Sequence, residues 1–538
     1  MNDHAVDFAI IGSGFGGSVA AMRLAEAGYR VVVLEEGLRF RDEDFAKTNW
    51  NLRRYLWAPW LRCFGVQAIT PLSGLWLLHG KGVGGGSLVY ANTLMQPRSA
   101  AFQSGAWPRS IDWEIELAPY FLKAKQMLGV TRNPIFGAAE RELQKLGEKL
   151  GCAETFHATD VGVYFGERSA VDPYFGGAGP LREPCNACGA CMVGCRVGAK
   201  NTLVKNYLWF AEKNGAVIRS ECKVDRLLPE TVGQGYRIRL RRTRSIFAKS
   251  EWIQADKVIV SAGVMGSLTL LSKMKQLGFL PRLSDALGAQ VRTNGESLVG
   301  ATSRRRDIDY SKGVAIGAAL HPDRVTKVEA VKYPSGSNAM RLLAVPLTGS
   351  GGRLLRPLRL TMEILKKPVD VLKLVAFGDW ARNSVILLVM QSLDEKIDLA
   401  WRRGFFGWRL MRASANSLPS FLPLAQEAAV LLAQQMNGIP QNVSPEVLLA
   451  APTTAHILGG CVLGDDERTS VVNADHEVHG YRGLYVCDGS VIPSNLGVNP
   501  SLTIAALAER FASRLVTKSV KVPIAGADVN APAPDSRS

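Results

Sequence analysis

The chain lacks any apolar run long enough to cross a bilayer. None of its uninterrupted hydrophobic stretches reaches the roughly 18 residues that a transmembrane helix requires, although 47% of the 538 residues are hydrophobic. It also lacks a basic leader, because the first residues, MNDHAVDFAI, pass directly into a strand-like segment. We therefore expect a globular protein without a secretory signal, in the cytoplasm.

Cysteine is scarce and unevenly placed, and acidic residues are in deficit. The nine cysteines are not spaced as the disulfide framework of a secreted protein would be. Aspartate and glutamate number 48 against 64 lysines and arginines, which gives a formal net charge of +16. This excess favours an anionic partner. Because no nucleic-acid-binding motif is present, we expect a peripheral membrane surface and no nucleic acid.

What the chain does contain is a dinucleotide-binding motif near its N-terminus. An apolar segment precedes GSGFGG at residues 12–17, a helix-like segment follows, and an acid, Glu35, ends the next apolar segment. Gly12 permits the tight turn, Gly14 lets a pyrophosphate approach the backbone, and Gly17 lets the helix pack on the strand. The helix N-terminus favours the anion, and Glu35 is placed to accept hydrogen bonds from a ribose.

Later segments predict a mixed α/β chain. Residues 1–40 read as β-α-β, residues 112–150 as helical and residues 214–260 as strands. Two further glycine turns, GKGVGGGSLVYAN at 80–92 and SAGVMGS at 261–267, indicate backbone pressed against a ligand or turns that need positive φ.

Two apolar segments each allow two interpretations. Residues 50–78, rich in Trp, Leu and Pro, predict either a buried segment or a lid over an apolar substrate. Residues 353–377 form a basic amphipathic stretch, broken by Pro357 and Pro368, which suits a membrane interface or an ordinary surface helix pair. The Pro/Ala/Asp-rich tail from Val522 predicts disorder.

Four cysteines cluster with the spacing C-x2-C-x2-C-x3-C. They are Cys185, Cys188, Cys191 and Cys195. This spacing is that of the bacterial ferredoxin run, which predicts a 4Fe–4S cluster, although the usual proline after the last cysteine is replaced by Arg196. Zinc and a metal-free group of reduced thiols are the alternatives.

The C-terminal region completes a family pattern. It contains HILGGC at 456–461, YVCDGSVIP at 485–493 and GVNP at 497–500. With the glycine motifs described above, these segments resemble the glucose–methanol–choline (GMC) flavoprotein oxidoreductases over nearly the whole chain, and within them the cholesterol oxidase-like branch. The resemblance implies FAD rather than NAD. It also implies an α/β fold in which a Rossmann-type FAD-binding domain is interleaved with a substrate domain built on an antiparallel β-sheet with helices.

The interleaving implied by the resemblance divides the chain into alternating parts. The FAD-binding domain would comprise 1–110, 201–300 and 451–518, the substrate domain 111–184 and 301–450, the cysteine-rich loop 185–200, and the tail 519–538.

The resemblance also implies residue roles. His456 matches the family's active-site histidine, and Asn499 matches a second position where many members carry histidine and where asparagine can bond the substrate oxygen. Glu329, in the run EAVKYPSG, resembles a glutamate base that moves a proton during double-bond isomerisation; the alternative is a strand glutamate facing water. The residues implied to hold FAD are Gly12, Gly14, Phe15, Gly16, Gly17, Glu35, Gly82, Gly84, Gly85, Gly86, Ser87, Ala262, Gly263, Asp488, Gly489, Asn499 and Pro500.

The resemblance and the apolar segments together imply FAD-dependent oxidation of a secondary alcohol, a 3-hydroxysteroid or similar bulky apolar molecule, with His456 as proton acceptor and O2, a quinone or a cytochrome as electron acceptor. An iron–sulfur cluster would favour a second hypothesis, a dehydrogenase acting on a non-steroid alcohol and passing electrons to a quinone or cytochrome. A lyase or isomerase with redox-silent FAD and a non-catalytic membrane-bound or electron-transfer subunit are the remaining hypotheses.

Overall fold

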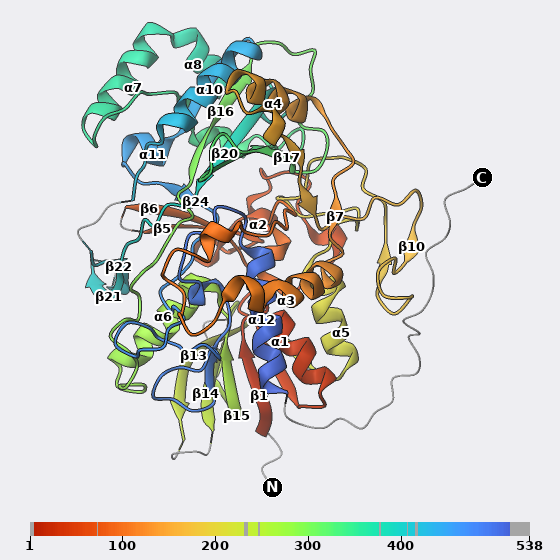
Figure 1. The fold of residues 1–538 in the computed structure, drawn as a ribbon, viewed down its shortest axis with the longest axis vertical. Helices are drawn as coiled ribbons and strands as arrows, with labels where there is room; N and C mark the ends of the chain where they lie inside the picture. The colour runs from red at the N-terminus through yellow and green to blue at the C-terminus, as the bar shows by residue number, and fades with distance from the viewer. Residues whose placement is uncertain are drawn as a thin grey trace.

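Two large β-sheets, one below the other in Figure 1, form the framework of the molecule. The computed structural model describes residues 5–516 except 73, 231–234, 246–247, 376–377, 406 and 415–417, so the tail predicted from Val522 lies outside the described residues. Within the described part, no helix is both long and apolar enough to pass through a membrane.

The lower sheet contains the predicted dinucleotide-binding unit. Its strands, in order, are β12 (Val217–Arg219), β2 (Val31–Leu34), β1 (Ala5–Ile11), β15 (Glu251–Val260), β14 (Tyr236–Arg242) and β13 (Cys222–Pro229), with β25 (Leu484–Val486) also paired to β15. β1 runs parallel to β2 and β15, whereas β13, β14 and β15 are antiparallel. β2 is buried throughout, as its β-branched run predicts for a parallel strand. The Rossmann-type half of the prediction is confirmed.

Helices cover this sheet. α1 (Phe15–Glu26) packs against α12 (Ser501–Leu515) and α5 (Tyr207–Lys213), and α3 (Trp113–Met127) lies on α12. α6 (Gly263–Gln276) packs on β13. The helical region predicted over 112–150 is in fact two helices, because Gly129, Pro134 and Gly137 interrupt it before α4 (Ala138–Lys149).

The upper sheet is antiparallel throughout. Its strands, in order, are β19 (Ala344–Pro346), β23 (Gly438–Val443), β16 (Ser297–Ser303), β20 (Ser384–Gln391), β18 (Thr326–Val331), β17 (Ile316–Leu320) and β8 (His157–Ala158). α4 and α10 (Pro423–Gln435) cover one face. Alternate residues of β18 divide between the faces: Val328 and Ala330 join the helix-covered core, whereas Val331 belongs to a separate apolar cluster on the other face.

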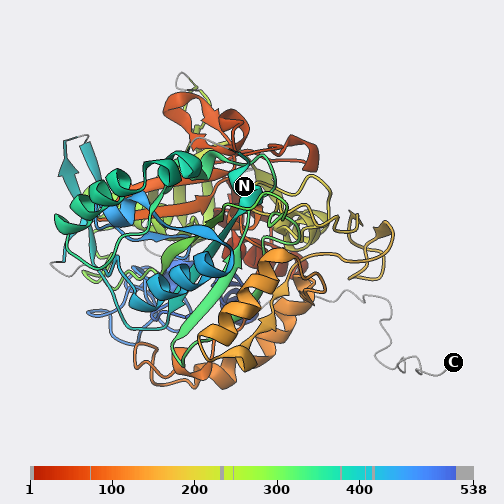
Figure 2. The ribbon, with the colours of Figure 1, turned by 90° about the horizontal axis from the view of Figure 1, so that it is seen from above.

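The segment 50–78 forms part of a small third sheet between the two large ones (Figure 1). After α2 (Leu52–Tyr55) and the hairpin of β3 (Trp57–Ala58) and β4 (Cys63–Phe64), β5 (Gln67–Leu72) pairs with β6 (Leu75–Gly80), and β24 (Thr453–Thr454) adds to β6. The amphipathic stretch 353–377 forms α7 (Leu355–Lys366) and α8 (Pro368–Val375) at the periphery of the upper half (Figure 1, Figure 2). Pro368 separates the two helices, whereas Pro357 is accommodated in the first turn of α7.

The remaining elements are short. They are β7 (Thr131–Arg132), β9 (Asp160–Val161), β10 (Ala170–Val171), β11 (Leu181–Arg182), α9 (Trp380–Asn383), β21 (Leu399–Gly404), β22 (Gly407–Arg412) and α11 (Ser444–Leu448).

Candidate active site

A cavity of about 710 Å³ is bounded by both large sheets and by the β5–β6 hairpin. One part is walled by the glycine turns at the ends of β1 and β15, and the other by the face of the upper sheet opposite α4 and α10. The predicted dinucleotide and substrate residues therefore meet in a single space. Segment 50–78 supplies part of its wall, through Trp57, Ile69 and Leu78.

The GSGFGG turn leaves room for a pyrophosphate at the N-terminus of α1. A Cβ on Gly12, whose φ is +102°, would lie 2.2 Å from the carbonyl oxygen of Ser261, and a Cβ on Gly17 would lie 2.2 Å from that of Gly12. A Cβ on Gly14 would meet nothing within 4 Å. Gly12 and Gly17 thus serve close packing, whereas Gly14 faces open space in the cavity wall, which fits the FAD pyrophosphate.

Glu35 is held where a ribose would bind. Its Oε2 accepts hydrogen bonds from the hydroxyl of Ser13 at 2.7 Å and from the backbone N–H of Ser13 at 3.2 Å, while Oε1 accepts the N–H of Gly37 at 2.8 Å. The side chain is buried and lines the cavity. The acid that follows β2 therefore contacts the turn that follows β1.

Most of the other residues predicted to hold FAD also line the cavity. These are Phe15, Gly16, Gly85, Gly86, Ala262, Gly263, Asp488, Gly489, Asn499 and Pro500. Gly17, Gly82, Gly84 and Ser87 do not line it. Ser87 instead supports the turn, because its hydroxyl donates to the carbonyl of Gly84 at 2.7 Å and accepts the N–H of Leu203 at 3.1 Å.

Asp488 is a buried acid at the end of β25. Its Oδ2 accepts the hydroxyl of Ser267 at 2.5 Å, and its Oδ1 accepts the N–H and hydroxyl of Ser490 at 2.8 and 2.6 Å. Burial raises the pKa of Asp488 more than these hydrogen bonds lower it. The hydrogen bonds from Ser267 and Ser490 hold the side chain on the cavity wall.

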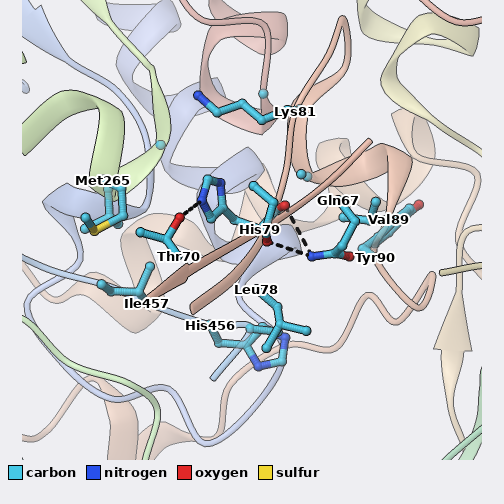
Figure 3. A pocket seen from close by; sticks show the side chains of 18 of the residues that line it. Gln67, Thr70, Leu78, His79, Lys81, Val89, Tyr90, Met265, His456 and Ile457 are labelled. Carbon is cyan, nitrogen blue, oxygen red and sulfur yellow. Dashed lines mark hydrogen bonds between the residues drawn. The ribbon is translucent and has the colours of Figure 1, made fainter. Parts of the chain in front are cut away.

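A charged cluster at the dinucleotide end was not predicted from the sequence. Burial would raise the pKa of Glu36, but Lys81 Nζ at 2.8 Å and Lys223 Nζ at 2.7 Å lower it to about 2. Lys81 and Lys223 both line the cavity, so two cations lie on the wall that would hold the dinucleotide part of FAD. Lys81 stands near the β5–β6 strands in Figure 3.

His456 is paired with a buried carboxylate that the sequence did not indicate. Its Nδ1 is hydrogen-bonded to Oε1 of Glu296, and the other oxygen, Oε2, accepts the N–H of Ala455 at 3.0 Å. Burial lowers the pKa of His456, but the charge and hydrogen bond of Glu296 outweigh burial and the net shift is upward. Since an ionised carboxylate only accepts hydrogen bonds, Nδ1 carries the proton and Nε2 is available to a ligand.

An antiparallel bridge brings these two side chains together. The backbones of Arg292 and Leu458 exchange hydrogen bonds of 2.8 and 2.9 Å, and Thr454 Oγ1 donates to the carbonyl of Thr293 at 3.1 Å. The segment before β16 thus lies beside the segment after β24.

His79 is a second histidine on the cavity wall (Figure 3). Its Nε2 lies 2.9 Å from Thr70 Oγ1, across the β5–β6 pair. Burial, together with the charge of Lys81, lowers the pKa of His79 to about 3. This ring is therefore neutral and far less basic than that of His456.

Asn499 lines the cavity, but Glu329 lies behind it. Asn499 Nδ2 donates to Oε2 of Glu329 at 3.3 Å, and among the described residues Asn499 Oδ1 is buried without a hydrogen-bond partner. Glu329 faces neither water nor a wholly apolar wall: it is buried, and Lys327 Nζ lies 2.6 Å from its Oε1. The alternation of β18 places Lys327 and Glu329 on one face, and only this spacing in the sequence could have indicated the pair.

The four clustered cysteines do not form a metal site in the part of the chain that the structure describes. No group of three or more His, Cys, Asp or Glu side chains there is placed to hold a metal ion, and the thiols are free. Cys185, Cys191 and Cys195 pack instead against a small core that includes Val161 and Val314. Burial raises the pKa of Cys185 to about 12. The described structure thus does not support the iron–sulfur or zinc interpretation.

Comparison with known proteins agrees with this geometry. Models of the GMC oxidoreductase family match residues 181–274 and 356–508, and a model of the NAD(P)-binding Rossmann-like domain matches residues 10–41. The chain is 44% identical over 533 residues to a cholesterol oxidase of Mycobacterium tuberculosis (94% of this chain, 90% of that protein). It is 41% identical over 533 residues to a cholesterol oxidase of Acinetobacter baumannii (96% of each).

The fold is shared with more distant flavoproteins. A formate oxidase of Aspergillus oryzae superposes with a TM-score of 0.63 at 15% identity, covering 95% of this chain and 98% of that one. The residues present fit FAD, and the full-length similarity is to flavoprotein oxidases. The chain belongs to the GMC oxidoreductase family and is an FAD-dependent alcohol oxidoreductase.

Proposed function

We propose that this protein oxidises the secondary hydroxyl group of a 3-hydroxysteroid or a similarly bulky apolar alcohol and passes the electrons to O2. The observation that carries the proposal is His456, which is anchored by Glu296 on the wall of a cavity lined by both the dinucleotide-binding turns and the apolar upper sheet. The names of the relatives at 44% and 41% identity support a sterol as the substrate class.

The substrate end of the cavity suits a rigid hydrocarbon. Its wall is largely apolar and includes Leu298, Ile316, Val331, Ile386, Leu388, Met340, Leu343 and Trp380. Polar side chains there are few, Gln441 and Asn442 among them. A sterol offers one hydroxyl group on a large apolar body, so burial of the body supplies affinity while the polar residues near His456 orient the hydroxyl.

His456 is the proposed proton acceptor. The flavin, when bound, supplies the hydride acceptor, and the protein must take the hydroxyl proton. Nδ1 of His456 is committed to Glu296, which leaves Nε2 to accept that proton, and the Glu296 carboxylate stabilises the resulting imidazolium. His79 is a poorer acceptor, because its pKa is lowered to about 3 and Thr70 holds its Nε2.

Asn499 is proposed to orient the substrate. Glu329 can only accept hydrogen bonds as a carboxylate, so it fixes Nδ2 of Asn499 towards itself and turns Oδ1 the other way. Among the described residues Oδ1 then has no hydrogen-bond donor, so it can accept the O–H of the alcohol as the substrate binds, and that single O–H turns to Nε2 of His456 for the proton transfer. Glu329 remains the candidate base for a coupled double-bond shift.

The experiment that tests this proposal measures hydrogen peroxide formation by the FAD-loaded protein with a panel of alcohols. We expect turnover with 3β-hydroxysterols and little with polyols. Peroxide formation only with non-steroid alcohols would overturn the substrate class. Reduction of an added quinone without peroxide would favour a dehydrogenase, and formation of an unoxidised product would favour a lyase or isomerase.

A second proposal, that the protein docks on an anionic membrane, rests on α7 and α8. Leu354, just before α7, and Leu365, in its last turn, are 89% and 75% exposed; Lys366 ends α7, and Arg353 and Lys367 flank the helix. α8 contacts the turn Ala339–Leu343, which contributes Met340 and Leu343 to the cavity wall. An exposed apolar and cationic surface beside an apolar cavity favours a negatively charged lipid bilayer as the occupant.

A further inference from the structure

Two charges are buried together behind the cavity wall. Lys327 and Glu329 lie two residues apart on β18, are 1% and 0% exposed, and form an ion pair of 2.6 Å. Lysine is rarely buried so completely, and removing both charges from water is unfavourable unless the site is well paired. Such a pair, one residue away from the reacting space, calls for a functional explanation.

Both oxygens of the Glu329 carboxylate are engaged. Oε1 accepts from Lys327 Nζ at 2.6 Å, and Oε2 accepts from Asn499 Nδ2 at 3.3 Å. Neither Lys327 nor Glu329 lines the cavity, whereas Asn499 does. A substrate therefore meets the amide of Asn499, with the carboxylate held behind it.

The pair is enclosed between the neighbouring strands of the upper sheet. Across the sheet, Met390 and Leu388 of β20 lie opposite Lys327 and Glu329, and Ala319 of β17 lies opposite Glu329 on the other side. His157 on β8 continues the row beyond Ala319. Burial lowers the pKa of His157, and the charge of Lys327 lowers it further. The imidazole is therefore neutral, and Lys327 is the cation that pairs with Glu329.

A double-bond shift needs a mobile base. In a 3-keto steroid whose double bond is one carbon removed from conjugation, a proton must leave the intervening carbon, reside on a base and return to the far carbon. The electron pair of the broken C–H bond moves into the ring system, and no electrons are gained or lost. A carboxylate serves this purpose when one oxygen is free to approach both carbons.

We propose that Lys327 is a specificity-determining residue that clamps Glu329, so that the protein releases the unconjugated ketone faster than it isomerises it. The inference rests on the proposed oxidation of a sterol. Lys327 is a positioning residue: it holds Glu329 as the fixed anion that orients Asn499 and withholds it from proton transfer to carbon.

The test supplies the preformed unconjugated 3-keto-5-ene steroid to the anaerobic, FAD-loaded protein and follows the ultraviolet absorbance of the conjugated enone. We expect slow isomerisation by the wild type and at least a roughly tenfold increase in Lys327→Met, because freeing a general base restores part of its usual contribution. Lys327→Arg keeps the cation and should behave as the wild type. Glu329→Gln combined with Lys327→Met should lose the gain.

If Lys327→Met folds poorly, a second variant and a measurement on the wild type still test the inference. Lys327→Gln retains a hydrogen-bond donor without the charge, and FAD absorbance reports folding of each variant. The ratio of unconjugated to conjugated ketone released by the wild type from a sterol needs no variant. Wild-type release of only the conjugated ketone, or no gain in either uncharged variant, would overturn the inference. Failure to oxidise sterols would overturn the proposed function instead, since the preformed ketone bypasses that step.

Discussion

Nδ1 of His456 is hydrogen-bonded to Oε1 of Glu296, a residue 160 positions away in the chain. This bond determines which imidazole nitrogen is available to a ligand and raises the pKa of the ring against the effect of burial. It joins the loop after β24 to the start of β16, and so ties the proposed proton acceptor to the sheet that walls the substrate space.

Glu296→Gln should shift the pH dependence of flavin reduction. The neutral imidazole is the active base, so the rate rises with pH through the raised pKa of His456. Loss of the carboxylate lowers that pKa, and the rise should move to lower pH. The plateau rate should fall at least about tenfold, because the imidazolium loses its ion pair. Anaerobic stopped-flow absorbance across pH measures both.

Glu446→Gln is the matched control for that variant. Burial raises the pKa of Glu446 to about 8, so this acid is already largely neutral at pH 7 and the amide changes little. An unaltered pH profile in Glu296→Gln, or an equal shift in Glu446→Gln, would contradict the assigned role of Glu296.

Gly14→Ala should separate FAD binding from folding. A Cβ at this position meets no protein atom within 4 Å but projects from a residue that lines the cavity, so the protein should fold and bind FAD at least about tenfold more weakly, a loss of roughly 1.4 kcal/mol. Gly16→Ala should instead prevent folding, since its Cβ would lie 1.8 Å from the carbonyl of Cys487. Flavin fluorescence titration and circular dichroism distinguish these effects. Normal FAD affinity in Gly14→Ala would show that the GSGFGG turn does not hold the FAD pyrophosphate.

Leu354→Ser combined with Leu365→Ser should weaken binding to vesicles that contain anionic lipid. Each leucine contributes about 1.5–3 kcal/mol when fully buried in an apolar phase, so the pair should cost at least about tenfold in vesicle affinity. Salt should weaken binding further, by screening the charges of Lys366 and Lys367. Leu277→Ser, at a half-exposed leucine after α6, is the control. Equal binding by all three proteins in a sedimentation assay would exclude this surface.

Local patterns predicted the dinucleotide end well, because its chemistry resides in short contiguous turns. GSGFGG and Glu35 lie within one β-α-β unit, and the structure places Gly14 and Glu35 on one cavity wall. The antiparallel upper sheet and its helices followed from the family resemblance. The roles of His456, Asn499 and Glu329 remain predictions, although the structure brings the first two to the cavity.

Contacts between side chains that are distant in the sequence could not be predicted from it. No sequence motif links Glu296 to His456, because the fold brings them together through the bridge between Arg292 and Leu458. The partner of Glu329 was missed because a lysine on a strand ordinarily faces water. The cysteine spacing suggested a metal that the described structure does not accommodate, because spacing alone does not determine where the sulfur atoms point.

The most direct test of the proposed mechanism is the rate at which a 3β-hydroxysterol bleaches the flavin of the FAD-loaded protein under anaerobic conditions, in the wild type and in His456→Ala. We predict rapid bleaching in the wild type and a rate at least about 100-fold lower in the variant, with FAD still bound. Equal rates would contradict the role of His456 as proton acceptor, and no bleaching of a fully loaded wild type would contradict the sterol as substrate.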